Sequence, residues 1–138
     1  MNTSTIFTWD TRVYYEDTDI GGVVYYANYL KFFERARAEY FRAVGVEQKN
    51  LAQSHNVMFV VKHASIDYHA PATLDDALNI TVTIKKFTKA SLHFLQTIQR
   101  ESTLLTTGSI IAACVRADTF RPCAIPPHTI QAIQQYSS

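Results

Sequence analysis

The sequence of 138 residues is poor in cysteine, glycine, proline and net charge. It holds two cysteines, four glycines and four prolines, and its formal net charge is +1. Two cysteines are too few for a disulfide framework and are typical of a reducing compartment. A net charge this small, without a run of lysines or arginines, gives no indication of binding to nucleic acid or to a membrane surface.

Long hydrophobic runs and nucleotide motifs are also missing. The longest apolar stretch is IIAACV at 110–115, which is far too short to cross a bilayer. No cationic and apolar leader opens the chain, so we expect a cytoplasmic protein. The sequence has no P-loop, no G-x-G-x-x-G and no G-x-S-x-G, which argues against nucleotide binding and against the usual serine hydrolases. With 47% hydrophobic and 18% charged residues, it is expected to form one globular domain over residues 1–138.

The most informative stretch is residues 12–45, RVYYEDTDIGGVVYYANYLKFFERARAEYFRAVG. Three carboxylates precede two adjacent glycines, which predicts a turn. From Tyr29 the apolar residues recur with the period of a helix and cover about half of its circumference. Asn28 is a candidate N-cap and Gly45 a candidate C′ residue. Such a wide apolar face predicts a helix that a sheet wraps.

The remaining pattern predicts strands around this helix. β-branched and aromatic residues are enriched in five segments, and short turns join the last three. These segments are residues 7–15, 57–69, 78–87, 91–100 and 104–118. Residues 47–56 are expected to be a polar connection, and residues 129–136 a short helix. The order predicts an α+β fold, in which an antiparallel sheet of about five strands has one long helix on one face. The uncovered face and edges of such a sheet favour an oligomer.

Arg37 interrupts the apolar face of the predicted helix. Two interpretations follow. Either the aliphatic stem of the side chain extends so that its guanidinium reaches water, or the guanidinium pairs with an acid at a buried edge.

The acidic cluster Glu16, Asp17 and Asp19 is the first candidate site. In an extended segment Asp17 and Asp19 would point to the same side. A carboxylate here could act as a base or a nucleophile, beside free N–H groups of a helix start that can hold an anion or a polarised carbonyl. The alternative is local turn chemistry, in which the aspartates accept backbone hydrogen bonds. The spacing does not match a calcium loop.

Two further clusters have functional and structural interpretations. His63, Ser65, Asp67 and His69 alternate along a predicted strand, so Asp67 and His69 could form a base–orienter pair or a two-ligand metal site. The alternative is a solvated row or a subunit contact. Three lysines surround the turn KKFTKAS and would suit a phosphate-bearing ligand, although lysines also protect sheet edges; they are Lys85, Lys86 and Lys89. Cys114 lies in an apolar strand and is expected to pack in the core.

Residues 12–37, RVYYEDTDIGGVVYYANYLKFFERAR, resemble the hot-dog-fold acyl-CoA thioesterases of the 4-hydroxybenzoyl-CoA thioesterase superfamily. More narrowly they resemble its Tol–Pal-associated (YbgC-type) branch. HAPATLDDAL, KASLHFLQTI and RPCAIPP extend the resemblance over nearly the whole chain. It implies a hot-dog fold, a homodimer or homotetramer, and hydrolysis of acyl-CoA to free acid and coenzyme A. Coenzyme A is then part of the substrate, and no separate cofactor is implied.

The resemblance also implies residue roles. Asp19 matches the catalytic carboxylate, and Tyr26 the helix-start position whose backbone N–H polarises the thioester carbonyl. The YbgC-type branch often has histidine where this chain has Tyr26. Tyr15 matches a tyrosine that lines the site, Asp17 matches a structural acid, and the three lysines would bind the coenzyme A phosphates.

Two alternatives to the thioesterase remain. One is a non-catalytic scaffold that binds acyl-CoA or an acyl carrier protein for phospholipid or envelope machinery. The other is a hot-dog dehydratase, which needs a catalytic histidine that the residues around Asp19 do not supply.

Overall fold

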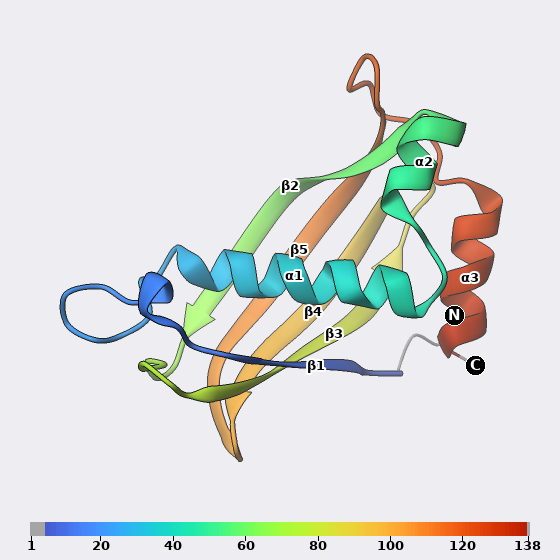
Figure 1. Cartoon of the computed structure of the whole chain (residues 1–138). Helices are drawn as coiled ribbons and strands as arrows, with labels where there is room; N and C mark the ends of the chain where they lie inside the picture. Colours follow the sequence, from blue (N-terminus) through green and yellow to red (C-terminus); the bar gives the residue numbers. More distant parts are fainter. Residues whose placement is uncertain (1–4, 138) are drawn as a thin grey trace.

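The structure is a computed structural model that describes residues 5–137 (Figure 1). A long helix lies across one face of a five-stranded sheet, and two shorter helices gather at one end. The elements in chain order are β1 Phe7–Arg12, a 3-10 helix Tyr15–Asp17, α1 Asn28–Ala43, α2 Gln48–His55, β2 Val57–Tyr68, β3 Ala77–Phe87, β4 Ser91–Arg100, β5 Thr103–Arg116 and α3 Pro127–Ser137.

The five strands form one antiparallel sheet in the order β1-β3-β4-β5-β2. β3, β4 and β5 follow one another through short hairpins, as the sequence predicted, and β2 pairs with the far side of β5. The predicted α+β hot-dog arrangement, a central helix wrapped by an antiparallel sheet, is confirmed. Within residues 5–137, no helix combines the length and the apolar character that a membrane crossing requires.

Some element boundaries differ from the prediction. The strand expected over residues 7–15 stops at Arg12, because the chain turns into the 3-10 helix at Tyr15. The polar connection expected over residues 47–56 is instead the helix α2. Leu51 is the only buried residue of α2, so the helix offered no apolar periodicity from which to predict it. The helix expected over residues 129–136 is confirmed as part of α3.

The two predicted ends of α1 have different outcomes. Gly45 is the predicted C′ residue, with a φ of 85° that favours glycine. Asn28 is not the N-cap, because Ala27 holds that position and Asn28 is already helical. The Asn28 side chain is buried and is used in a tertiary hydrogen bond.

The core lies between α1 and the sheet. The buried face of α1 is largely aromatic and packs on aliphatic residues of β3, β4 and β5; its members include Tyr29, Phe32, Phe33, Tyr40 and Phe41. Burying an aromatic or aliphatic side chain stabilises the fold by about 1.5–3 kcal/mol. At the far end of α1, the Tyr40 ring packs edge-on against Tyr136 of α3, with 5.7 Å between ring centroids.

Both interpretations of Arg37 are wrong. The residue is only 8% exposed, so its side chain is buried and does not extend into bulk water. It donates from Nη1 to Oε1 of Gln96 over 2.9 Å, and Gln96 in turn donates to the carbonyl of Phe33 over 3.1 Å. The partner is therefore a neutral amide of β4, and burial lowers the pKa of Arg37 although nearby Glu34 opposes that shift.

Gly108 of β5 packs directly against the ring of Phe33 on α1. A Cβ atom at this position would lie 2.7 Å from Cε2 of the Phe33 ring. Any side chain would therefore push the helix away from the sheet at the centre of the core.

We predict that Gly108→Ala lowers the free energy of unfolding by about 1–3 kcal/mol, because the added methyl overpacks the core against Phe33. Urea denaturation measures the change, with Ser109→Ala on the exposed side of β5 as the matched control. Equal stability of the two variants would contradict the packing described here.

Candidate active site

The segment between the 3-10 helix and α1 folds into a small hairpin that projects beyond the helix start (Figure 1). Thr18 and Val24 form an antiparallel bridge, and the N–H of Asp19 donates to the carbonyl of Val23 over 2.9 Å. Gly22, with a φ of 79°, completes the turn. The glycine pair that predicted a turn therefore forms the tip of this hairpin; Asp19 lies just before it, whereas Glu16 and Asp17 belong to the 3-10 helix.

Asp17 is a structural carboxylate. It is 5% exposed and accepts two hydrogen bonds, from the N–H of Tyr14 over 2.9 Å and from Nδ2 of Asn28 over 2.8 Å. These bonds tie the exit of β1 to the first turn of α1. The prediction that Asp17 and Asp19 share a side is wrong, because the 3-10 helix turns Asp17 into the interior and leaves Asp19 outside.

Asp19 presents an exposed carboxylate at the hairpin tip. Its Oδ1 accepts the N–H of Gly21 over 2.8 Å, which holds the side chain in one orientation. Among residues 5–137 no donor reaches Oδ2 in a hydrogen bond. One carboxylate oxygen is thus positioned by the turn, and the other is open to water or to a ligand.

Tyr26 lies two residues before the start of α1. In the part of the chain that the structure describes, the backbone N–H groups of Tyr26 and Ala27 donate to no protein acceptor. The Tyr26 carbonyl accepts the hydroxyl of Tyr68 over 3.1 Å, which anchors this segment to the end of β2. Two unused N–H donors at the positive end of a 16-residue helix can polarise a carbonyl oxygen.

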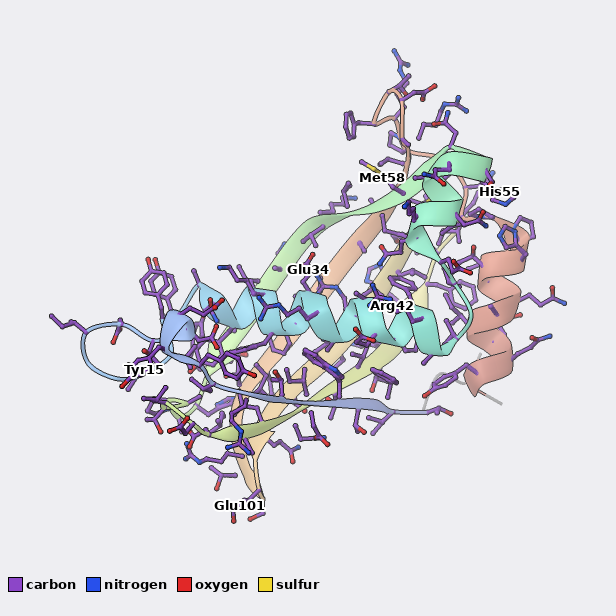
Figure 2. All side chains as sticks on the ribbon, in the orientation of Figure 1. Tyr15, Glu34, Arg42, His55, Met58 and Glu101 are labelled. Atoms are coloured by element: carbon purple, nitrogen blue, oxygen red, sulfur yellow. The ribbon has the colours of Figure 1, made fainter. Side chains whose placement is uncertain are left out.

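The Tyr15 side chain is 82% exposed at the outer end of the molecule (Figure 2). It borders a shallow surface depression together with Leu74 and Asp75, and that depression includes neither Asp19 nor Tyr26. The carbonyl of Tyr15 accepts the N–H of Thr18, which precedes Asp19, but the depression beside the Tyr15 ring does not extend to Asp19 or Tyr26.

The lysines lie at the opposite end of the sheet. The beginning of β3 lies near the hairpin, because the Ala72 carbonyl in the preceding loop accepts the N–H of Val24. The lysines lie at and just beyond the other end of β3; they are Lys85, Lys86 and Lys89. At about 3.3 Å per residue, the length of β3 separates them from the hairpin by roughly 30 Å. One chain alone does not join the lysines to Asp19.

The structure adds two residues to the lysine cluster that the sequence did not suggest. Lys62 lies at a bulge of β2, and His93 pairs with Lys86 across β3 and β4. Burial lowers the pKa of His93, and the positive charges of Lys86, Lys62 and Lys85 lower it further. Only the strand pairing across the sheet brings these residues together, so no local sequence pattern could have shown it.

The polar row on β2 remains a surface feature. His63, Ser65, Asp67 and His69 are exposed, and Nε2 of His69 pairs with the Thr107 hydroxyl at 3.1 Å. Residues 5–137 contain no group of three or more metal-ligating side chains. The prediction that Cys114 packs in the core is confirmed by its complete burial.

Exposed apolar and aromatic side chains, here called the apolar strip, occur at the start of α1 and on β2. Its members are exposed by 43–63% although they are large and apolar or aromatic; they are Tyr26, Leu30, Val61 and Tyr68. Next to this strip, Arg37, Phe41 and Phe59 help to line a cavity of about 320 Å³. β2 pairs with β5 on one side only, so its other edge carries unpaired backbone groups.

Comparisons with known proteins agree with this architecture. Residues 13–133 match the model of the thioesterase-like superfamily. The "Acyl-CoA thioester hydrolase YbgC" of Escherichia coli O6:H1 is 43% identical over 136 residues, which cover 98% of this chain and 100% of that protein. A probable thioesterase from Bartonella henselae superimposes with a TM-score of 0.84 at 34% identity, over 88% of this chain and 100% of that one. A 1,4-dihydroxy-2-naphthoyl-CoA thioesterase from Synechocystis superimposes with a TM-score of 0.88 at 26% identity, over 97% of this chain and 99% of that one.

We predict that the two aspartates affect stability very differently. Asp17→Ala removes two hydrogen bonds to a buried carboxylate and leaves Asn28 without its acceptor, so the free energy of unfolding should fall by roughly 2–4 kcal/mol. Asp19→Ala alters an exposed turn and should change it by less than about 1 kcal/mol. Chemical denaturation of both variants measures the difference, and a larger effect at Asp19 would contradict this assignment.

Proposed function

The chain belongs to the thioesterase-like superfamily, and on that premise we propose that it hydrolyses the thioester bond of acyl-CoA to a free acid and coenzyme A. The observation that carries this proposal is the hairpin itself. It presents the open carboxylate of Asp19 on the same short segment as the unused N–H groups of Tyr26 and Ala27. The names of the E. coli and Synechocystis relatives support a coenzyme A thioester as the substrate.

The chemistry follows from these groups. Attack on the thioester carbonyl builds negative charge on its oxygen, and the N–H groups of Tyr26 and Ala27 stabilise that charge. Asp19 either removes a proton from the attacking water or attacks directly to form a mixed anhydride that water then opens. Both routes consume one water and release a carboxylic acid and the thiol of coenzyme A.

The role proposed for Tyr26 resides in its backbone. The side chain is 63% exposed and its ring lies 4.9 Å from that of Tyr25. A backbone N–H donates in the same way from a tyrosine as from the histidine that is common in YbgC-type relatives. The reaction proposed here therefore needs Asp19 as its only titrating side chain.

We further propose that two copies pair through the free edges of β2. The apolar strip beside that edge would be covered, and an isologous two-fold contact satisfies the unpaired backbone groups of both strands. When Val57–Tyr68 pairs antiparallel with itself, Tyr68 of one copy lies opposite Val57 of the other. Since Tyr68 contacts Tyr26, the active site of each copy then adjoins the beginning of β2 in the second copy.

This pairing gives the lysines a role. Val60, near the beginning of β2, pairs with Ala113 of β5, which pairs with Ser91 of β4. Ser91 directly follows the turn between β3 and β4 around which the lysines lie. The lysines of one copy would therefore lie on the same side as the active site of the other. We propose that Lys85, Lys86 and Lys89 bind the phosphates of coenzyme A across this dimer, with Tyr15 at the rim of the site. A further pairing of dimers, a cytoplasmic location and a Tol–Pal association remain predictions.

The proposed reaction predicts that Asp19→Asn lowers kcat by at least about 100-fold, because the amide neither attacks nor accepts the proton. Release of free thiol from a panel of short, long and aromatic acyl-CoAs measures the rate. Glu16→Gln, which changes an exposed acid of the same segment, is the matched control.

Two outcomes would redirect the proposal. Turnover that survives Asp19→Asn would show that another carboxylate acts, and the Asp67 and His69 pair would be tested next. Binding of acyl-CoA by the wild type without any thiol release would instead support a scaffold for acyl-CoA or an acyl carrier protein.

Replacing Lys85, Lys86 and Lys89 together with alanine should raise KM for acyl-CoA roughly 10-fold with little change in kcat, because three exposed charge pairs to phosphate are lost. Lys31→Ala with Lys49→Ala, which removes exposed lysines elsewhere, is the control. An unchanged KM in the triple variant would contradict the phosphate role.

The environment of His93 gives a test of the same site that needs no turnover. Lysine charges help to lower the pKa of His93, so phosphates bound among those lysines should raise it, while the effect of burial remains. NMR titration of the imidazole with and without coenzyme A measures this shift. A pKa that coenzyme A leaves unchanged under saturating conditions would place its phosphates elsewhere.

A further inference from the structure

The two cysteines meet at the end of β5, and the proposed reaction uses neither thiol. After Arg116 the chain reverses, and residues 121–123 run antiparallel to the end of the strand. The N–H of Arg116 donates to the carbonyl of Arg121 over 2.8 Å, and the N–H of Cys123 donates to the carbonyl of Cys114 over 3.0 Å. With the bridge between Val115 and Pro122, this register places the two cysteines directly opposite each other.

The geometry of this pair is close to that of a disulfide. The two Sγ atoms are 3.7 Å apart. Directly opposed residues in antiparallel segments have Cα atoms about 4.5–5.5 Å apart. That separation falls within the range of about 4.4–6.8 Å seen in disulfides, whose S–S bond is about 2.05 Å long. Bond formation requires the two Sγ atoms to move from 3.7 Å apart to about 2.05 Å.

The two thiols differ in their surroundings. Cys114 is completely buried, and burial together with the neighbouring thiol raises its pKa to about 12. Its sulfur also lies 3.8 Å from the carbonyl oxygen of Ala124. Cys123 is only partly buried, so a dissolved oxidant meets it first.

We propose that Cys114 and Cys123 are a redox modification site, at which a peroxide converts the two thiols reversibly into one disulfide. The Cys123 thiol loses its proton, the thiolate attacks the peroxide and becomes a sulfenic acid, and the released hydroxide takes up that proton and leaves as water. The sulfur of Cys114 then displaces the sulfenic oxygen, which leaves as a second water, and the S–S bond forms. One hydrogen peroxide takes two electrons from the two thiols, and thiol reductants reverse the change.

The crosslink would constrain the connection between β5 and α3. It closes a loop that carries the exposed Phe120 and fixes the segment from which α3 leaves the core. α3 is held by the buried Ile133 and by the contact between Tyr136 and Tyr40. Closing this loop restricts the unfolded chain, so the oxidised protein should be more stable. The crosslink is expected to act first on stability; because the N–H of Cys114 donates to the carbonyl of Ala90 and the N–H of Ile125 to that of Lys89, it also lies beside the lysine turn that the proposed dimer uses.

The test uses the full chain, freed of reductant and treated with hydrogen peroxide in slight excess. We expect the intact mass to fall by two hydrogen atoms and both thiols to become unreactive toward a maleimide after unfolding. Dithiothreitol should restore them. The midpoint of thermal unfolding should rise by roughly 5–10 °C in the oxidised form.

Two variants make the result specific. Cys123→Ser replaces a half-buried thiol and should fold, yet it should show neither the loss of mass nor the rise in unfolding temperature. Cys114→Ala should likewise show neither the loss of two hydrogen atoms nor the rise in unfolding temperature. The proposal is overturned if peroxide adds oxygen to Cys123 without forming the bond, if it links two copies on a non-reducing gel, or if both thiols stay reactive.

Discussion

The arrangement of the proposed site depends on the two hydrogen bonds of the buried Asp17 carboxylate. They join the N–H of Tyr14, where the chain leaves β1, to the Asn28 side chain at the start of α1. Because these two points are fixed together, the residues between them must close into a hairpin, whose tip projects beyond the start of α1 while Val24 packs in the core. Asp19 and the free N–H groups before α1 are both held on that hairpin. A carboxylate that takes no part in the proposed chemistry thus determines where the reacting groups lie.

The fold was predictable from the sequence wherever burial leaves a periodic pattern. The aromatic face of α1 and the strands of the sheet were found this way, because one buried face imposes the helical period or the strand alternation. α2 was missed because it buries only Leu51, and the partner of Arg37 was missed because Gln96 is 59 residues away in sequence. Tertiary contacts of this kind leave no local signal.

The site was predictable only in part. The acids and the glycine pair indicated a turn before a helix, and the family resemblance singled out Asp19 and Tyr26. The different burial of Asp17 and Asp19 arises from a 3-10 helix of three residues, too short to leave a pattern. Lys62 and His93 lie near Lys85 and Lys86 only because the sheet brings together the strands that carry them. The separation between that cluster and Asp19 in one chain is a property of the topology, and it makes the pairing of two β2 edges central to the proposed function.

In the proposed reaction the N–H groups of Tyr26 and Ala27 polarise a thioester carbonyl beside Asp19. Vibrational difference spectroscopy tests this most directly, with an acyl-CoA carrying ¹³C at the thioester carbonyl bound to Asp19→Asn so that it is not consumed. Because hydrogen bonds from these N–H groups weaken the C=O bond, we expect the carbonyl stretch of the bound thioester to lie at lower frequency than that of free acyl-CoA. A bound thioester whose carbonyl stretch is unshifted would contradict it.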